Sequence, residues 1–575
     1  MVKREGKYVN ISAREIVETI EALSAALMDL GLKPGQRVGL LSETRPEWAF
    51  ADMAILCVSG VTVPIYSTLP PAQIEYIIKD SGMEILFVSG IAAMQKILEI
   101  KNRVPQLRKV IVMDAPESLP DKVVSLSQLV TQGQSELQKN PGIVRDRNSM
   151  SKPEDVFTIV YTSGTTGIPK GVMLTHANIV SNIRAIFVFF QFRPDDRALS
   201  FLPLSHIFER MAGYYCLLYA GATIAYAESV EAMPKNLLEV RPTVLMSVPR
   251  VYEKFYSRIM DKVAAEHGLK KKLALWAFKI AEKKTEAMLQ KKPPSFFFSI
   301  RYALADALVL SKIRNRLGGR LRLLVSGGAA LPRSLALFFH GVGFTILEGY
   351  GLTETSPVIA CNRPDHFKFG TVGPAIPGVE IKIAEDGEIL TRGPHVMKGY
   401  FNKPKETSDV ITADGWFRTG DIGEIDPDGF LRITDRKKDL IVTSAGKNIA
   451  PQFVENALKP SRYVAQIVVV GDKRKFPSAL VVPNMENLKK FAAANGISEN
   501  DILTHPAVLK EIQNDFDRLS LDLASFERVK KFALLENEFT VDSGEMTPSM
   551  KVRRNVVEKK YKDVIDEFYS DPVLN

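Results

Sequence analysis

The chain has 575 residues with a net charge of +9, and 46% of its residues are hydrophobic. A single hydrophobic core stops growing near about 250 to 300 residues, so a chain of this length divides into several subdomains. The modest positive charge favours solubility and attraction of anionic ligands. Zinc-finger spacing and aromatic RNA-binding signatures are missing from the sequence, which argues against nucleic-acid binding.

The three cysteines, Cys57, Cys216 and Cys361, lie far apart and form no CxxC pair. This spacing is typical of a reducing compartment and argues against disulfides or a structural zinc site. No apolar stretch reaches the roughly 18 to 20 residues needed to span a bilayer, and the first ten residues lack the apolar core of a signal peptide. We therefore expect a cytoplasmic protein.

The first half of the chain alternates helical patterns with buried strands. Ser12 and Glu15 have the spacing of a capping box for a helix that ends near Gly31, and a strand is expected at 37–43. Seven further apolar strands are expected at 61–65, 84–90, 110–114, 157–162, 223–228, 243–249 and 321–328. The alternation predicts an α/β fold with two doubly wound, parallel sheets.

After about residue 370 the pattern changes to short strands with tight turns, including a hairpin whose turn is Asp428-Gly429. A charged stretch from Asp435 to Asp439 then precedes a segment that mixes helices with strands, although charged runs are usually solvated loops. We predict a large N-terminal domain that includes a small β-rich subdomain, then a hinge, and then a small, mobile α+β domain. The expected bounds are 1–435 with the subdomain at about 370–435, 436–439, and 440–575.

A Ser/Thr/Gly-rich run, YTSGTTGIPKG (161–171), follows a predicted strand and precedes a helix expected to open near Thr175. In that position backbone N–H groups can face phosphate oxygens. Pro169 precedes the lysine and Gly171 follows it, so the run is not a Walker A loop. Taken alone, the run could also be a linker. Its candidate phosphate-binding residues are Thr162, Ser163, Gly164, Thr165, Thr166, Gly167 and Lys170.

The longer run YTSGTTGIPKGVMLTH resembles the signature of the adenylate-forming superfamily, which includes acyl-CoA synthetases, luciferases and the adenylation domains of peptide synthetases. Further runs occur in that family's order and spacing, and the resemblance covers nearly the whole chain. They are SGGAAL (326–331), GYGLTET (349–355), WFRTGDIG (416–423) with ITDRKKD (433–439), and TPSMKVRR (547–554).

The resemblance implies a site for ATP and Mg²⁺. Tyr350 would stack on adenine, and Asp421 with Arg436 would bind the ribose. Thr353 would contact the α-phosphate, and Glu354 would hold Mg²⁺ together with Thr162, since hard cations choose oxygen ligands. The small residues Gly328, Ala329 and Gly351 would line the nucleotide slot.

Lys551 matches the catalytic lysine of the family. A carboxylate that attacks an α-phosphate brings two anions together, and two unit charges about 4 Å apart repel by roughly 4 kcal/mol at an effective dielectric of about 20. Mg²⁺ and Lys551 would offset this repulsion. The step needs no base, because a carboxylic acid with a pKa near about 4 is already ionised at pH 7. Without the ordered motifs, the lysine-rich end of the chain would be typical of a solvated tail.

The resemblance also implies a second half-reaction, in which the C-terminal domain rotates and CoA accepts the acyl group. Lys438 would lie at the hinge, and Gly446 would move toward the pantetheine path, although this glycine could simply cap a turn. His206 matches a residue beside the acyl carboxylate and Tyr252 matches a gate to the acyl tunnel. Apolar segments at 182–192 and 203–221 could form that tunnel or could be ordinary core.

The runs at 43–69 and 435–455 are similar to long-chain fatty acyl-CoA synthetases, so the expected substrates are a fatty acid, ATP and CoA. Two alternatives stay open: a fatty acyl-AMP ligase that loads a carrier protein, and a non-catalytic lipid-binding relative. Family members usually have a further segment before the strand and helix at 7–16, so monomer and homodimer both stay open.

The segment at 267–322 mixes basic clusters with aromatic and aliphatic residues. It could rest on the inner face of a membrane, because each Lys or Arg near an anionic leaflet contributes about 1 kcal/mol. The alternative is a helical excursion packed on the domain, with its lysines in solvent. The lysines expected to contact the membrane are Lys270, Lys271, Lys272, Lys283 and Lys284.

Overall fold

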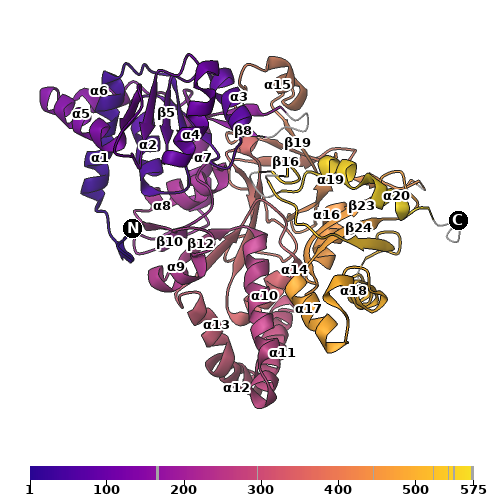
Figure 1. Ribbon diagram of the computed structural model, residues 1–575. Helices are drawn as coiled ribbons and strands as arrows, with labels where there is room; N and C mark the ends of the chain where they lie inside the picture. The colour runs from indigo at the N-terminus through magenta and orange to yellow at the C-terminus, as the bar shows by residue number, and fades with distance from the viewer. Residues whose placement is uncertain are drawn as a thin grey trace.

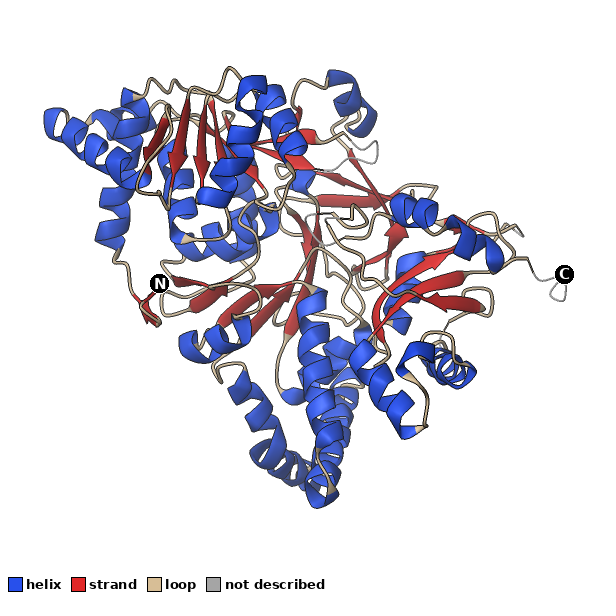
Figure 2. Ribbon diagram, viewed as in Figure 1, coloured by secondary structure: helices blue, strands red, loops and turns tan. Residues whose placement is uncertain are grey.

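A computed structural model shows two large sheets, a small β-subdomain and a C-terminal α+β domain (Figures 1 and 2). This architecture confirms the expected fold class, except that both large sheets are mixed rather than wholly parallel. The structure describes residues 1–162, 168–293, 295–444, 446–521, 523–541, 543–547 and 551–570.

The first sheet has eight strands in the order β18-β9-β8-β4-β3-β5-β6-β7. Strands β3 to β8 run parallel to their neighbours, whereas β9 is antiparallel to β8 and β18 is antiparallel to β9. The strands are β3 (Arg37–Leu41), β4 (Val61–Ile65), β5 (Ile85–Val88), β6 (Lys109–Val112), β7 (Val123–Ser125), β8 (Val156–Thr162), β9 (Lys170–Thr175) and β18 (Gly399–Tyr400).

Helices cover both faces of this sheet because alternate strand residues point to opposite sides. In β5, Ile85 and Phe87 join the core under α1 and α2, whereas Leu86 and Val88 join the core under α3 and α4. The helices of this region are α1 (Ala13–Asp29), α2 (Pro46–Cys57), α3 (Pro71–Ser81), α4 (Ile91–Ile100), α5 (Leu126–Lys139), α6 (Ile143–Asn148) and α7 (His176–Phe187). The predicted capping box is present at the start of α1, where Ser12 and Glu15 bond reciprocally.

The second sheet has six strands in the order β11-β10-β12-β13-β14-β15, with β15 antiparallel to β14. A hairpin of β1 (Val2–Arg4) and β2 (Lys7–Val9) lies beside β11. The strands are β10 (Arg197–Ser200), β11 (Thr223–Tyr226), β12 (Val244–Ser247), β13 (Leu323–Ser326), β14 (Ile346–Gly351) and β15 (Val358–Cys361). One core cluster is shared between the two large sheets through α7 and the helices after β10.

The other face of the second sheet carries a long helical excursion. Figure 1 shows α11 and α12 at the lower end of the molecule, extending beyond the sheets. The helices of this face are α9 (Met233–Val240), α10 (Pro249–Ala265), α11 (Gly268–Leu289), α12 (Phe296–Ala305), α13 (Ser311–Arg316) and α14 (Arg333–Val342), with a π-helical segment at Asp306–Leu310. Helix α8 (Cys216–Tyr219) and the π-helical segment before it, Glu209–Tyr215, lie on the opposite face, in the core between the two large sheets.

The β-subdomain is an antiparallel sheet in the order β16-β17-β19-β20. Its β19–β20 hairpin turns at the predicted place, where Gly429 N donates to Asp426 O at 2.9 Å. The elements are β16 (Glu380–Ile383), β17 (Glu388–Arg392), β19 (Phe417–Ile425) and β20 (Leu431–Arg436), with α15 (Pro404–Val410) nearby.

The C-terminal domain packs helices on both faces of a three-stranded sheet, β23-β24-β25. Helices α16, α17 and α18 cover one face, and α19 and α20 cover the other. Its strands are β21 (Ile441–Val442), β22 (Asn448–Ile449), β23 (Val464–Val470), β24 (Ser478–Pro483) and β25 (Lys531–Leu534). Its helices are α16 (Pro451–Leu458), α17 (Met485–Ala494), α18 (Pro506–Leu519), α19 (Arg554–Lys560) and α20 (Lys562–Glu567). Across the described part of the chain, no helix has both the length and the apolar character to cross a membrane.

Candidate active site

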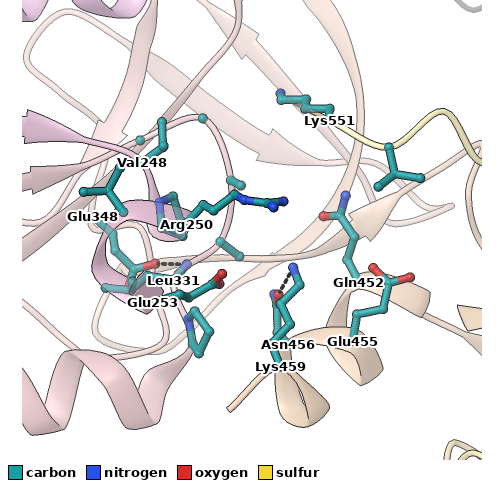
Figure 3. A pocket seen from close by; sticks show the side chains of 18 of the residues that line it. Val248, Arg250, Glu253, Leu331, Glu348, Gln452, Glu455, Asn456, Lys459 and Lys551 are labelled. Carbon is teal, nitrogen blue, oxygen red and sulfur yellow. Dashed lines mark hydrogen bonds between the residues drawn. The ribbon is translucent and has the colours of Figure 1, made fainter. Parts of the chain in front are cut away.

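A cleft of about 3650 Å³ lies where the second sheet, the β-subdomain and the C-terminal domain meet. Figure 3 shows part of it, with Arg250 and Glu253 of α10 on one side and Gln452 and Lys459 at the start and end of α16 opposite them. Lys551 of the C-terminal domain extends into the same space.

The Ser/Thr/Gly-rich run connects two strands, not a strand and a helix. Thr162 ends β8 and pairs with Lys170, the first residue of antiparallel strand β9. Helix α7 does begin at the predicted place, with Thr175 as its N-cap, but β9 separates it from the loop. The expected step from this loop directly into a helix is therefore wrong, because the N-terminus of α7 lies a full strand away. The candidates Ser163, Gly164, Thr165, Thr166 and Gly167 lie outside the described residues.

Tyr350, Asp421 and Arg436 form one bonded cluster on the cleft wall, here called the Asp421 cluster. The hydroxyl of Tyr350 donates to Asp421 Oδ2 at 2.6 Å, and Arg436 Nε lies 3.1 Å from Oδ1. Asp421 on β19 and Arg436 on β20 are register partners, so the sheet itself brings them together. Burial and the Asp421 carboxylate raise the pKa of Tyr350 far above its usual value. Asp421 is 3% exposed, and a charge that deeply buried requires such partners.

Backbone geometry explains two of the small residues of the cleft, Gly328 and Gly351. Gly328 has φ +82°, a backbone conformation that side chains rarely adopt, and Ala329 next to it is exposed in the cleft. At Gly351 an added Cβ would lie 1.8 Å from the carbonyl oxygen of Pro357. Only glycine fits there, which lets the chain turn from β14 into the short helix Thr353–Thr355 that carries Thr353 and Glu354.

Glu354 is held by a tyrosine that sequence reasoning missed. Tyr400 of β18 donates its hydroxyl to Glu354 Oε1 at 3.0 Å, and Lys170 Nζ lies 5.0 Å from the centre of the Tyr400 ring. The backbone of Glu354 is fixed as well, because Met397 N donates to its carbonyl at 2.8 Å. The phosphate-loop lysine and the predicted metal ligand are therefore neighbours of one ring. Nothing in the local sequence KGYF marks Tyr400 for this position.

The residues around Glu354 are compatible with Mg²⁺ held mainly by a nucleotide. Among the residues that the structure describes, no three His, Cys, Asp or Glu side chains gather as a metal site. Among the described residues, the Glu354 carboxylate and the Thr162 hydroxyl line the cleft. Mg²⁺ is usually bound through one or two carboxylates plus substrate phosphates, so these oxygen donors fit that ion.

Lys551 reaches the cleft from the C-terminal domain, where its backbone is bonded to Thr547. Thr547 N donates to Lys551 O at 2.7 Å, and Lys551 N donates to Thr547 Oγ1 at 3.0 Å. The side chain touches solvent inside the cleft, but the surrounding protein and then Arg436 lower its pKa to about 8, against the opposing effect of Asp421 and Glu354. Charges of the N-terminal part thus act directly on a residue of the C-terminal domain.

Arg554 anchors the chain just after Lys551, and sequence reasoning gave it no role although it belongs to the TPSMKVRR run. Its guanidinium donates to Val469 O at 2.8 Å and to Glu455 on α16. Glu455 is buried and also accepts a bond from Val469 N at 2.8 Å. A paired arginine and glutamate therefore connect the start of α19 to the centre of the C-terminal domain.

His206 lies near Lys551, as the resemblance implied. Phe208 N donates to His206 Nδ1 at 3.1 Å, which leaves the proton of the neutral ring on Nε2. Burial and the positive charge of Lys551 lower the pKa of His206 to about 4. His206 is therefore neutral at pH 7 and can donate one hydrogen bond from Nε2.

Tyr252 does not line the cleft. It is completely buried, donates its hydroxyl to Val325 O at 3.1 Å, and packs against Phe339 with ring centres 5.9 Å apart. Arg250 and Glu253 on the same helix face the cleft instead. The position corrects the predicted gate role: Tyr252 lies on the inner face of α10, where a helical period of 3.6 residues directs it into the core.

The two residues linked to domain rotation lie in different places. Lys438 faces the cleft, where burial and the charges of Lys170 and Arg436 lower its pKa. Gly446, with φ +71°, lies in the turn between β21 and β22, is exposed, and is not among the residues that line the cleft. In this arrangement of the domains the structure brings Lys438, but not Gly446, to the site.

A buried acid, Glu348, was also missed. It lies in β14 and faces the cleft, where its carboxylate accepts a bond from Leu331 N at 3.1 Å (Figure 3). Burial raises the pKa of Glu348 to about 8. The sequence carried a signal, because an acid inside the apolar run TILEGY is unusual in a buried strand.

Comparison with known proteins agrees with this fold and identifies the family. Residues 1–401 match the family of AMP-binding enzymes, and residues 438–572 match the C-terminal domain of AMP-binding enzymes. The chain therefore belongs to the AMP-binding, adenylate-forming family.

Similar curated proteins span nearly the whole chain. Long-chain-fatty-acid–CoA ligase FadD15 of Mycobacterium tuberculosis is 37% identical over 572 residues, which cover 98% of this chain and 93% of that protein. Human long-chain-fatty-acid–CoA ligase 1 is 33% identical over 603 residues, covering 99% and 83% of the two chains. Among solved structures, the adenylation domain of a Mycobacterium chelonae carboxylate reductase has a TM-score of 0.75 at 22% identity, covering 98% and 85% of the two chains, and supports the fold.

Proposed function

We propose that the protein activates a long-chain fatty acid with ATP and transfers the acyl group to CoA. The observation that carries this proposal is the convergence in one cleft of the Asp421 cluster, Glu354 and Lys551, with Lys551 supplied by a separate domain. A protein that only bound lipid would have no need for a buried aspartate cluster and a cleft lysine in this arrangement.

In the first half-reaction a carboxylate oxygen of the fatty acid attacks the α-phosphorus of ATP. The bond between the α-phosphorus and the bridging oxygen breaks, and pyrophosphate leaves with its electron pair. Asp421 accepts hydrogen bonds from the ribose hydroxyls through lone pairs that Tyr350 and Arg436 leave open, while Gly328 and Ala329 border the base. Thr353 lies one residue from Glu354 and donates to the α-phosphate.

Lys551 and His206 handle the charges of this step. Protonated Lys551 offsets the repulsion between the carboxylate and the α-phosphate. Neutral His206 donates from Nε2 to the acyl carboxylate and holds it without competing for the proton, because its pKa is about 4. Glu354 and Thr162 would hold Mg²⁺, which supplies electrostatic neutralisation of the phosphates when bound.

The second half-reaction requires another arrangement of the domains. The thiolate of CoA attacks the acyl carbon, the acyl–oxygen bond breaks, and AMP leaves with the electron pair. We infer that the C-terminal domain turns about residues 436–439, withdraws Lys551 and brings Gly446 toward the acyl carbon. The crowding of Lys438 by Lys170 and Arg436 favours this turn once pyrophosphate no longer neutralises the site.

The preference for long chains rests on two supports. Apolar side chains of the cleft continue from His206 into the N-terminal part, including Ile186, Phe190, Met211 and Met246. The relatives with 33% to 37% identity over their shared length are named as long-chain-fatty-acid–CoA ligases. Transfer to a carrier protein is the second candidate, since the first half-reaction would be the same.

One assay separates these functions. The protein is incubated with ATP, Mg²⁺ and palmitate, with and without CoA, and AMP, palmitoyl-AMP and palmitoyl-CoA are measured. We expect palmitoyl-CoA and stoichiometric AMP when CoA is present. Palmitoyl-AMP that accumulates and ignores CoA would favour the carrier-protein function, and a complete lack of AMP and acyl-AMP would contradict both.

A further inference from the structure

The helix α12 exposes an apolar stripe that nothing in the described chain covers. Phe296 and Phe297 are 76% and 77% exposed, and Ile300, Leu304 and Leu308 follow at helical spacing with 45%, 52% and 44%. These five residues are here called the α12 outer face. Figure 1 shows that α12 lies at the lower tip of the molecule, away from both large sheets.

The inner face of the same helical run is already used for packing. Phe298, Tyr302, Ala305 and Leu310 join the core of the second sheet. Tyr302 also donates its hydroxyl to Gly341 O at 3.2 Å, which fixes the rotation of α12. The helix is therefore apolar on both sides, whereas a surface helix normally carries polar residues on its outer side. Packing within this chain does not account for the outer face.

Basic residues precede, interrupt and follow the α12 outer face in the sequence. Residues 290–320 contain seven Lys or Arg and a single acid, Asp306. Asp306 is neutralised because Arg314 pairs with both of its oxygens, at 2.6 and 2.7 Å. The exposed cations near the stripe are Lys291, Lys292, Arg301, Lys312 and Arg316.

We propose that the α12 outer face and its basic rim dock on an anionic lipid bilayer, with the apolar stripe in the headgroup region and the cations over the lipid phosphates. An in-plane amphipathic helix with aromatic residues on one side and Lys/Arg beside them has the chemistry of an interfacial membrane helix. A second copy of this chain fits less well, because a symmetric contact would place the two basic rims against each other.

Two lysines of α11 have partners within the protein. Lys284 lies over the ring of Tyr302, 3.9 Å from its centre. Lys271 donates to Ala264 O at 3.2 Å. The cations chosen for the test are therefore those adjacent in sequence to the α12 outer face.

The test is co-sedimentation of the full chain with vesicles of phosphatidylcholine alone or with 30% phosphatidylglycerol, without fatty acid, ATP or CoA. Phe296→Ser/Phe297→Ser should lower partitioning into anionic vesicles about tenfold or more. Lys291→Gln/Lys292→Gln/Arg301→Gln should remove the preference for anionic vesicles, which high salt should also remove from the wild-type protein. The matched control, Val17→Ser/Leu521→Ser, replaces two exposed apolar residues elsewhere and should bind like wild type.

Equal circular dichroism melting and equal ligase activity in solution would show that the α12 variants are folded. Wild-type binding that is absent, indifferent to phosphatidylglycerol, or unchanged by the Phe296/Phe297 variant would overturn the inference. A concentration-dependent dimer in sedimentation velocity that the same variant abolishes would assign the face to a second copy instead. The proposed fatty-acid substrate gives membrane docking a biological reason, but the docking itself does not depend on that substrate. Because the assay holds no substrate, failure here and failure of the proposed function are separate results.

Discussion

The two walls of the cleft are held in place by different means. On the N-terminal wall, Asp421 and Arg436 are register partners on β19 and β20, and Tyr350 reaches Asp421 from β14 of the second sheet by a hydrogen bond. On the C-terminal wall, Lys551 is bonded to Thr547 and followed by the Arg554–Glu455 pair, and charges of the opposite wall shift its pKa. The proposed nucleotide-binding residues are therefore fixed where two sheets meet, whereas the position of Lys551 depends on where the C-terminal domain sits.

The largest loss should come from breaking the fixed wall. Asp421→Ala removes the acceptor shared by Tyr350 and Arg436 and by the proposed ribose, so kcat/KM for both half-reactions should fall about 100-fold to 1000-fold. Nucleotide binding by calorimetry and both half-reactions should be measured. The control is Glu424→Ala, on the same strand as Asp421. It removes an exposed partner of Arg432 and should leave activity within about twofold. Equal losses in the two variants would show that Asp421 acts only through folding.

A smaller loss of activity should follow from destabilising the C-terminal wall near Lys551. Arg554→Met leaves the buried Glu455 unpaired and frees the start of α19, so adenylation should fall about tenfold or more. Thioester formation from supplied acyl-AMP should change much less. The control Lys559→Met alters an exposed residue of the same helix. If both half-reactions fell equally in Arg554→Met, the division between the two walls would be contradicted.

The charge coupling between the walls predicts a pH dependence. Lys551 is active when protonated, and its pKa in the free enzyme is about 8, so kcat/KM for adenylation should decline as pH rises through about 8. The value at pH 9 should be about tenfold below that at pH 7. Lys551→Arg should have a lower but flat profile over this range, because arginine keeps its charge. A wild-type profile that stays flat to pH 9.5 would exclude this coupling.

The smallest catalytic effect should come from Tyr252. Tyr252→Leu opens a core position and removes the bond to Val325, so the free energy of unfolding should fall by about 2 kcal/mol. The KM values for C8 to C18 fatty acids should keep their order, with changes within about threefold, because Tyr252 does not line the cleft. A shift of the preferred chain length would restore the gate role.

The sequence predicts the fold well where local patterns and packing agree. The strands at 37–41, 61–65 and 85–88 are apolar on both sides, and they lie in a sheet covered on both faces. The prediction failed at Lys170–Thr175, where a short antiparallel strand looks locally like the end of a loop and only pairing with β8 reveals it. Strands β8 and β9 are consecutive in the chain, so the failure came from treating the run as the approach to a helix and not from a pairing distant in sequence.

The candidate site could also be predicted only in part from the sequence. Residues inside ordered motifs, such as Asp421 and Glu354, could be named from sequence and do face the cleft. Tyr400 and Glu348 could not be assigned a role, because their bonds to Glu354 and Leu331 join segments that are distant in sequence. Tyr252 could be matched by position, but whether a helix residue points to a cleft or a core is decided by the packing of α10 against α14.

The central claim is that Lys551 serves the first half-reaction and withdraws for the second. Its most direct test is to measure Lys551→Ala in both half-reactions: ATP-dependent formation of palmitoyl-AMP, and conversion of supplied palmitoyl-AMP with CoA. We predict that adenylation falls by about 100-fold or more while thioester formation stays within about threefold of wild type. Equal losses in the two half-reactions, in a protein that melts like wild type, would contradict this account.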